Sequence, residues 1–152
     1  MSSTNEEKLR EELAKALEEL QILQANYEVL KNSLDTLVAL LNETRIVKNE
    51  LKTINEQEGE KEVLVPLGTR VLLQAKIKGN PKLLYALGAG ILASLSPEEI
   101  DKKLSELEKK LTDDIAKLQK DITELLRKIA LTQELAQNLQ EKLRKILQSR
   151  KS

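Results

Sequence analysis

The chain has 152 residues, a third of them charged, and its 25 basic and 25 acidic residues cancel. This balance gives no sign of binding to nucleic acid or to an anionic membrane surface. The absence of His and Cys excludes His or Cys catalysis and the usual zinc sites, so we expect no enzymatic activity, no cofactor and no metal.

Residues 5–57 carry apolar residues at spacings of three and four, the pattern of a coiled-coil helix. With two Tyr and no Phe or Trp in the chain, this Leu-rich helix suits an elongated protein better than a globular core. The repeat shortens to two threes in a row near its end. The predicted seam consists of Leu9, Leu13, Ala16, Leu20, Leu23, Tyr27, Leu30, Leu34, Leu37, Leu41, Thr44, Val47, Leu51 and Ile54.

Residues 58–96 change to a period of two, which predicts four short strands in two β-hairpins. Turn residues separate them at 68–69, 78–81 and 88–90. Two-stranded hairpins are marginal in water, and these are apolar on both faces, so we expect strands of other subunits to complete them. The predicted subunit-assembly residues are Val63, Val65, Leu67, Val71, Leu73, Ile77, Leu83, Tyr85, Leu87 and Ile91.

Residues 97–149 form a second predicted coiled-coil helix. Ser96 is placed to cap it, Pro97 suits the first helical position, and Glu99 completes a capping box. Its seam consists of Ile100, Leu104, Leu107, Leu111, Ile115, Leu118, Ile122, Leu125, Ile129, Thr132, Ala136, Leu139, Leu143 and Ile146.

The two seams match when one is reversed. Paired residue numbers always sum to 154, 155 or 156, as for Ile54 with Ile100 and Leu9 with Ile146. We therefore predict an α+β, mainly α fold: a long antiparallel coiled-coil hairpin with the four-strand block at its closed end. A parallel homodimer through each helix is the alternative, and it would leave the matched seams unexplained.

The layout resembles the alpha-type subunit of the prefoldin family, in its archaeal-like form with a two-hairpin linker. The most specific residues are Leu64-Val65-Pro66-Leu67-Gly68, Lys76-Ile77 and Gly88-Ala89-Gly90. Two places depart from the family pattern: Ala75 stands where the family usually has Gly, and 91–94 lack its aromatic and Glu. The Ala75 difference predicts the loss of a bulge or of a close backbone approach there.

The resemblance implies a hexamer of two alpha and four beta subunits, closed by an intersubunit β-barrel. It implies an ATP-independent chaperone, a holdase, that binds unfolded client proteins and delivers them to a group II chaperonin. The alternative function is a structural coiled-coil scaffold or tether built on the same barrel, without client binding. No apolar run approaches the ~20 residues of a membrane span, and residues 1–12 resemble no signal peptide, so we expect a cytoplasmic protein.

Apolar residues near both chain ends exceed what a two-helix seam needs. Leu17 falls at heptad position e and Ile22 at c, while Leu135 falls at g and Leu147 at e. Contiguous apolar surface at an open end is a candidate contact site, and extra packing within the coil is the other interpretation. The predicted client-binding tip residues are Leu9, Leu13, Leu17, Ile22, Leu135, Leu139, Leu143 and Leu147.

Charge separates toward the chain ends: residues 127–152 hold seven basic and two acidic residues, while Glu residues crowd the first turns. Acids at a helix N-terminus and bases at a C-terminus suit the helix dipole, which is a sufficient explanation. Docking to an acidic chaperonin surface is the second hypothesis, through Lys142, Arg144, Lys145, Arg150 and Lys151.

Overall fold

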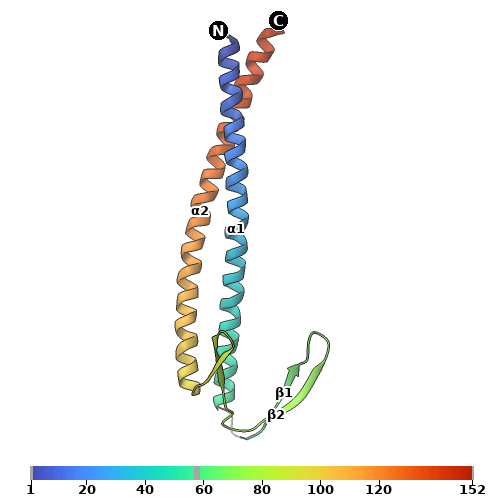
Figure 1. Ribbon diagram of the computed structural model, residues 1–152, viewed down its shortest axis with the longest axis vertical. Coiled ribbons are helices and arrows are strands. Elements are labelled where there is room, and N and C mark those ends of the chain that lie inside the picture. Colours follow the sequence, from blue (N-terminus) through green and yellow to red (C-terminus); the bar gives the residue numbers. More distant parts are fainter. Residues whose placement is uncertain (1, 57–58, 152) are drawn as a thin grey trace. The chain divides into compact units, whose positions relative to one another are not determined.

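The computed structural model describes residues 2–56 and 59–151. Two long helices, α1 (Ser2–Glu56) and α2 (Pro97–Arg150), flank four strands in chain order (Figure 1). The strands are β1 (Lys61–Pro66), β2 (Leu72–Ile77), β3 (Leu84–Gly88) and β4 (Ile91–Ser94). The predicted mainly α fold with two antiparallel hairpins is confirmed, although residues 57 and 58, at one predicted boundary, lie outside the described residues.

Contacts divide the chain into two compact units, each holding a segment of both helices. The terminal unit is Met1–Val38 with Asp113–Ser152, and the strand unit is Ala39–Thr112. In the terminal unit Glu6 contacts Arg150, and Ala16 packs with Leu139, so the two segments run antiparallel. In the strand unit Lys48 contacts Glu108, and the later Leu51 lines a small hollow with the earlier Pro97, which gives the same direction.

The predicted seams occupy the inner faces of the helices. Every predicted seam residue is buried or half-buried except Val47, which is 40% exposed. The buried hydroxyls of Thr44 and Thr132 donate to the carbonyls of Leu40 and Lys128, at 2.8 and 2.9 Å. Each threonine therefore satisfies its polar group within its own helix, and it can occupy the seam without a partner across it.

The assignment of Val47 to the seam was wrong, and Lys48 takes that place. Lys48 is four residues after Thr44, so the ordinary spacing of three and four continues through it. Its side chain is 27% exposed, and its Nζ lies 3.1 Å from Glu108 Oε2. A lysine can serve here because its aliphatic stem packs along the seam while its ammonium group reaches the carboxylate.

Helix α2 begins as the sequence predicts. The backbone N–H of Glu99 donates to Ser96 Oγ at 3.2 Å, and the Ile100 N–H donates to the Ser96 carbonyl at 3.0 Å. The first bond satisfies a donor that has no partner within the helix, and the second is the first helical bond. Pro97 needs no such bond, which is why it fits the first helical position.

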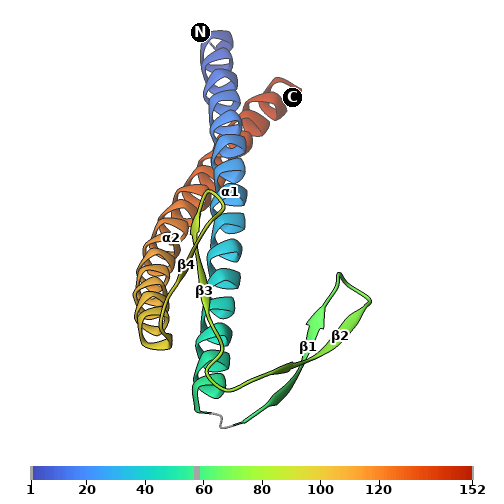
Figure 2. The same ribbon diagram turned by 60° about the horizontal axis from the view of Figure 1, so that its bottom comes forward.

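The two hairpins are separate two-stranded sheets (Figure 2). Strands β1 and β2 pair in unbroken register from Lys61 with Ile77 to Pro66 with Leu72, and Ala75 lies regularly opposite Val63. The pairing of β3 with β4 shifts between Ala86 and Gly88, so the irregularity of the strand block lies in the second hairpin. A bulge is therefore absent at Ala75 and present beyond Ala86.

The backbone conformation of the β3–β4 turn requires glycine at position 88. Gly88 has φ of 104°, a region that is costly for residues with a Cβ, and nothing lies within 4 Å of where a Cβ would stand. We expect Gly88→Ala to destabilise this hairpin by about 1–2 kcal/mol through torsional strain alone. Hydrogen–deuterium exchange of the β3 and β4 amides would measure it as faster exchange.

Gly79→Ala is the matched control for that change. Its φ lies outside the left-handed region, and the added Cβ would meet only ordinary contacts at 3.9 Å. Equal exchange rates of the β3 and β4 amides in both variants would show that the φ of Gly88 does not determine the stability of this hairpin.

Candidate functional site

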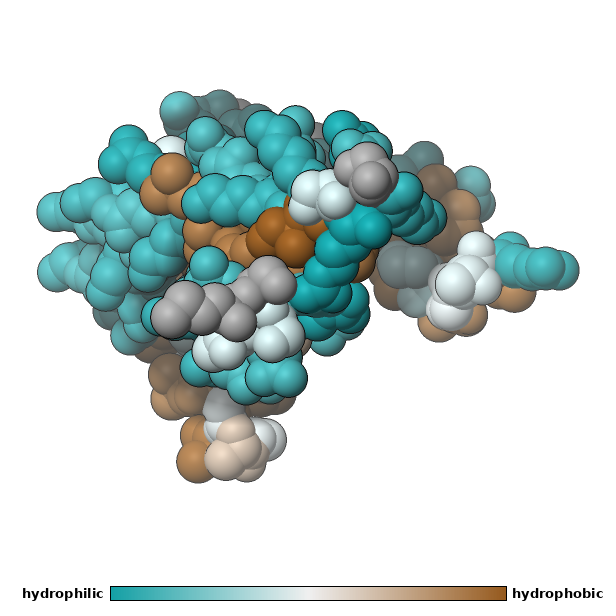
Figure 3. All heavy atoms as spheres, turned by 90° about the horizontal axis from the view of Figure 1, so that it is seen from above, coloured by the Kyte–Doolittle hydropathy of each residue, from teal (hydrophilic) through white to brown (hydrophobic). Residues whose placement is uncertain are grey.

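The structure exposes four of the eight predicted tip residues. Leu17, Ile22, Leu135 and Leu147 are 42%, 56%, 51% and 40% exposed, and all belong to the terminal unit. Viewed onto the end that carries both termini, apolar surface is visible among hydrophilic side chains (Figure 3). These four side chains are free to meet another molecule.

The other four predicted tip residues contribute to the interior of the coil. Leu139 and Leu143 are buried, and the half-buried Leu9 and Leu13 pack against the cluster of Ala16, Ala136 and Leu139. Their main role in this conformation is therefore to hold the two helices together. Only four of the eight predicted tip residues are therefore available to contact another molecule.

A shallow hollow of about 330 Å³ shows which exposed apolar residues share a side of the terminal unit. Val29 and Glu124 both line it, one from each helix. Ile22 lies seven residues before Val29, and Leu131 seven residues after Glu124, so each repeats the face of its heptad mate. Ile22, Val29 and Leu131 therefore share one side of this unit.

Leu135 belongs to that side as well, because it follows the hollow-lining Lys128 by seven residues. Leu17 and Leu147, at position e of their helices, lie on the other side of the seam. Val29 and Leu126 are also exposed, and the sequence analysis did not include them among the tip residues. Val29 could have been found, because it repeats heptad position c one heptad after Ile22.

The predicted assembly residues lie on the two hairpins and fall into two classes of exposure. Val63, Ile77, Leu83 and Tyr85 are half-buried, and the other six are exposed. Sequence reasoning left out the opposite faces of the strands, where further apolar residues are also exposed: Leu64, Leu72, Leu84 and Leu92. Both faces of each hairpin thus present uncovered apolar side chains.

One hairpin has a specific link to the helices. Lys103 Nζ lies 5.8 Å from the centroid of the Tyr85 ring, within the range of a cation–π interaction. Pro81 and Leu83 also line a small hollow of about 100 Å³ together with Leu51 and Ile54 of α1. Tyr85 of β3 thus lies close to α2, and the residues just before β3 lie close to α1, within the strand unit.

The five basic residues proposed for chaperonin docking are exposed near the end of α2. Arg150 differs from the others because its Nη1 forms an ion pair with Oε2 of Glu6 on α1. Its charge is already compensated inside the terminal unit. Lys142, Arg144, Lys145 and Lys151 carry the exposed basic surface.

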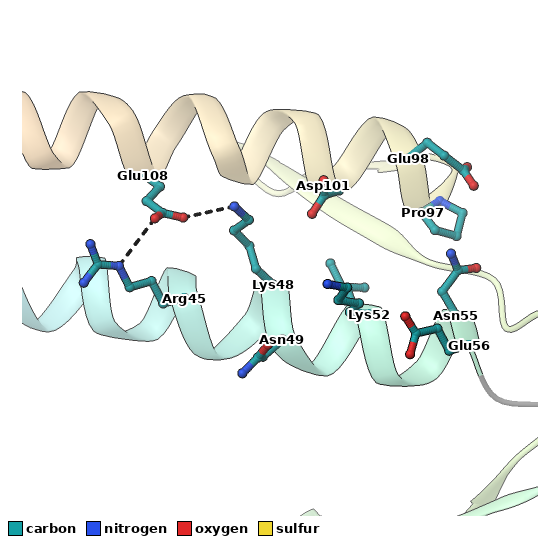
Figure 4. Close-up of a pocket in the computed structure, with 11 residues that line it drawn as sticks. Arg45, Lys48, Asn49, Lys52, Asn55, Glu56, Pro97, Glu98, Asp101 and Glu108 are labelled. Carbon is teal, nitrogen blue, oxygen red and sulfur yellow. Dashed lines mark hydrogen bonds and ion pairs between the residues drawn. The ribbon is translucent and has the colours of Figure 1, made fainter.

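In the strand unit, Glu108 of α2 forms ion pairs with two basic side chains of α1. Lys48 Nζ lies 3.1 Å from Glu108 Oε2, and Arg45 Nε lies 3.4 Å from Glu108 Oε1 (Figure 4). These residues border a hollow of about 740 Å³, in which Lys52 of α1 and Asp101 of α2 also lie (Figure 4). Opposite charges thus face each other across the two helices.

These ion pairs lower the pKa of two carboxyl groups. The pKa of Glu108 falls below its ordinary 4.5 mainly because Lys48 donates to it, and that of Glu6 falls below 4.5 mainly because Arg10 donates to it. A carboxylate with a lowered folded-state pKa stabilises the fold above its ordinary pKa, and this contribution disappears as the pH falls through the folded pKa.

We therefore expect Glu6→Gln with Glu108→Gln to lower the thermal unfolding midpoint at neutral pH. The deficit should persist down to pH 4.5 and shrink below it, because the native carboxylates then become protonated and resemble Gln. Circular dichroism melts across this range would measure the difference between the two proteins. A difference in unfolding midpoint that stayed constant at lower pH would show that the ionised Glu6 and Glu108 are not its cause.

Within residues 2–56 and 59–151, neither helix has a stretch apolar and long enough to cross a bilayer. The same residues bring together no group of three or more carboxylates suited to a metal ion.

The described fold defines a class of protein, a two-helix coiled-coil subunit with a pair of β-hairpins between its helices. The family model for the prefoldin subunit matches residues 23–142. The chain belongs to the prefoldin family. This membership supports a role as a chaperone subunit.

Individual relatives agree with this family. Prefoldin subunit alpha 1 of Thermococcus kodakarensis is 34% identical over 100 residues, covering 60% of this chain and 68% of the relative. Prefoldin subunit alpha of Methanopyrus kandleri is 32% identical over 95 residues, covering 62% of this chain and 60% of the relative. A cryo-EM structure of filamentous prefoldin from Methanocaldococcus jannaschii matches with a TM-score of 0.62 at 28% identity, covering 77% of this chain and 94% of that one.

Proposed function

We propose that the chain is an alpha-type subunit of an ATP-independent holdase that binds non-native proteins through the exposed apolar residues of its terminal unit. The observation that carries this proposal is the exposure of Leu17, Ile22, Leu135 and Leu147 beside a seam that is already filled. Aliphatic side chains that the coil does not need offer contact of low specificity, which suits clients that share only exposed apolar segments.

For assembly, we propose that 58–96 is an oligomerisation block and that beta-type subunits complete its strands, in a hexamer of two alpha and four beta subunits. The support is the apolar surface on both faces of hairpins that have only two strands each. Delivery of clients to a group II chaperonin, with the exposed basic residues of α2 as a docking surface, completes the proposal. We place the complex in the cytoplasm and propose no enzymatic activity.

The test is light scattering from a denatured protein that aggregates on dilution. The assembled protein should suppress scattering at near-stoichiometric amounts, without ATP. Unchanged scattering at a severalfold excess would reject the holdase and favour the alternative function, a coiled-coil scaffold or tether.

A second mode of assembly has one specific observation in its favour. The solved relative with a TM-score of 0.62 is filamentous, which favours an assembly in which copies of this chain join through their own strands. Electron microscopy of the chain alone, and then with a beta-type subunit, would distinguish filaments from a closed hexamer.

A further inference from the structure

The polar contacts between the two helices lie in or beside the seam, where they can affect which helices pair. Lys48 occupies a seam position, and Glu108 binds it together with Arg45. The Lys48 and Glu108 side chains are only 27% and 28% exposed, so neither is an ordinary solvated surface charge. A charge held in a helix interface is costly unless its partner is present.

The terminal unit contains the same arrangement with the signs exchanged between the helices. Glu6 of α1 is only 8% exposed, and it is bound by Arg150 of α2 and by Arg10 of its own helix. Here the acid belongs to α1 and the interhelical base to α2. In the strand unit the bases belong to α1 and the acid to α2.

This arrangement of signs distinguishes the native pairing from its competitors. In a parallel pair of two α1 helices, Lys48 would face Lys48 and Glu6 would face Glu6. In a parallel pair of two α2 helices, Glu108 would face Glu108. Like charges in the interface disfavour both, whereas α1 against antiparallel α2 places acid against base in each unit.

We infer that Glu108, with Arg45 and Lys48, determines partner choice in the coil, directing α1 to an antiparallel α2 instead of to a second α1. The inference rests on the fold and is independent of client binding. Apolar seams alone would discriminate poorly, because every seam is rich in Leu. A need for discrimination arises wherever strand assembly brings several such chains close together, since α1 of one copy then meets α1 of another. Among matched α2 helices, the covalent connection through the strands favours the one in the same chain.

Cross-linking tests this inference directly, because the chain has no native Cys. Asn55→Cys and Glu98→Cys place one thiol on each helix beside the same hollow, outside the charged cluster (Figure 4). A short bis-maleimide then gives an intrachain product at 17.2 kDa or an interchain product of twice that mass, which a denaturing gel separates.

Four backgrounds are compared: the native charges, Glu108→Lys, Arg45→Glu with Lys48→Glu, and all three changes together. We expect intrachain product with native charges and at least a threefold loss of it in each mismatched background. The triple variant restores opposite charges with the signs exchanged, so it should recover the intrachain product. Mixing the two mismatched chains should raise the interchain product, because each then supplies the helix that the other lacks.

Circular dichroism of every variant distinguishes altered pairing from unfolding. Intrachain yields that stay at the native level in both mismatched variants would overturn the inference. Failure of the triple variant to recover the yield would also overturn it, because a loss without recovery reflects general damage to the helices.

Discussion

Replacing Leu17, Ile22, Leu135 and Leu147 with Ser should abolish suppression of aggregation while leaving assembly intact. These side chains are exposed and belong to the terminal unit, whereas the hairpins belong to the strand unit. Each change removes about 1 kcal/mol of available apolar contact. Four changes remove about 4 kcal/mol, close to a thousandfold in affinity, and several subunits gripping one client multiply the loss.

The matched control replaces four exposed polar residues of the same two helices with Ser: Gln21, Gln24, Gln137 and Gln140. Both variants lose a comparable helix propensity, so they differ mainly in apolar surface. Light scattering measures suppression, and sedimentation measures assembly. Suppression that persists in the Leu and Ile variant, with its assembly intact, would place client binding elsewhere on the chain.

The second large effect concerns assembly through the hairpins. Leu73→Glu with Ile91→Glu, one change in each hairpin, should convert the assembled protein into a species that sediments as a 17.2 kDa monomer. Both side chains are exposed in the single chain, so the substitutions cost the isolated subunit little. In an intersubunit sheet or barrel the two carboxylates would be buried without partners, at a cost of several kcal/mol each.

Gln74→Glu with Ser94→Glu is the corresponding control, because these exposed polar residues alternate with the first pair on the opposite strand faces. Assembly that survives only in this control would identify the predicted face as the buried one. Loss of assembly in both would indicate that both faces are covered, as the exposure of Leu64, Leu72, Leu84 and Leu92 suggests. Assembly that survives in all variants would contradict a role for the hairpins.

The helices, their direction and the strand order were predictable because each has a strong local signal. A Leu-rich seam without Gly or Pro predicts a continuous helix, and the matched numbering of two such seams predicts an antiparallel partner. Ser96 with Glu99 marks the start of α2, and the Gly88–Gly90 turn separates β3 from β4.

Lys48 was missed for a physical reason. Apolar pattern matching selects the valine of a Val-Lys pair, whereas helix geometry after Thr44 requires the residue four positions on. The charge is acceptable only because Glu108 lies opposite, and no local pattern contains that information. The heptad phase did separate the buried Leu139, a predicted seam residue, from the exposed Leu135 at position g. The predicted tip set included both because it also used proximity to the chain ends.

The distribution of the two tyrosines has a consequence for spectroscopy. Tyr27 is half-buried in the terminal unit and Tyr85 is half-buried in the strand unit, and the chain contains no Trp. Each tyrosine can therefore report optically on one unit, and single-Tyr variants would follow the two units separately during unfolding. Light absorbed only by Trp would not excite this chain, so a single Trp introduced by substitution would report on its own position against a dark background.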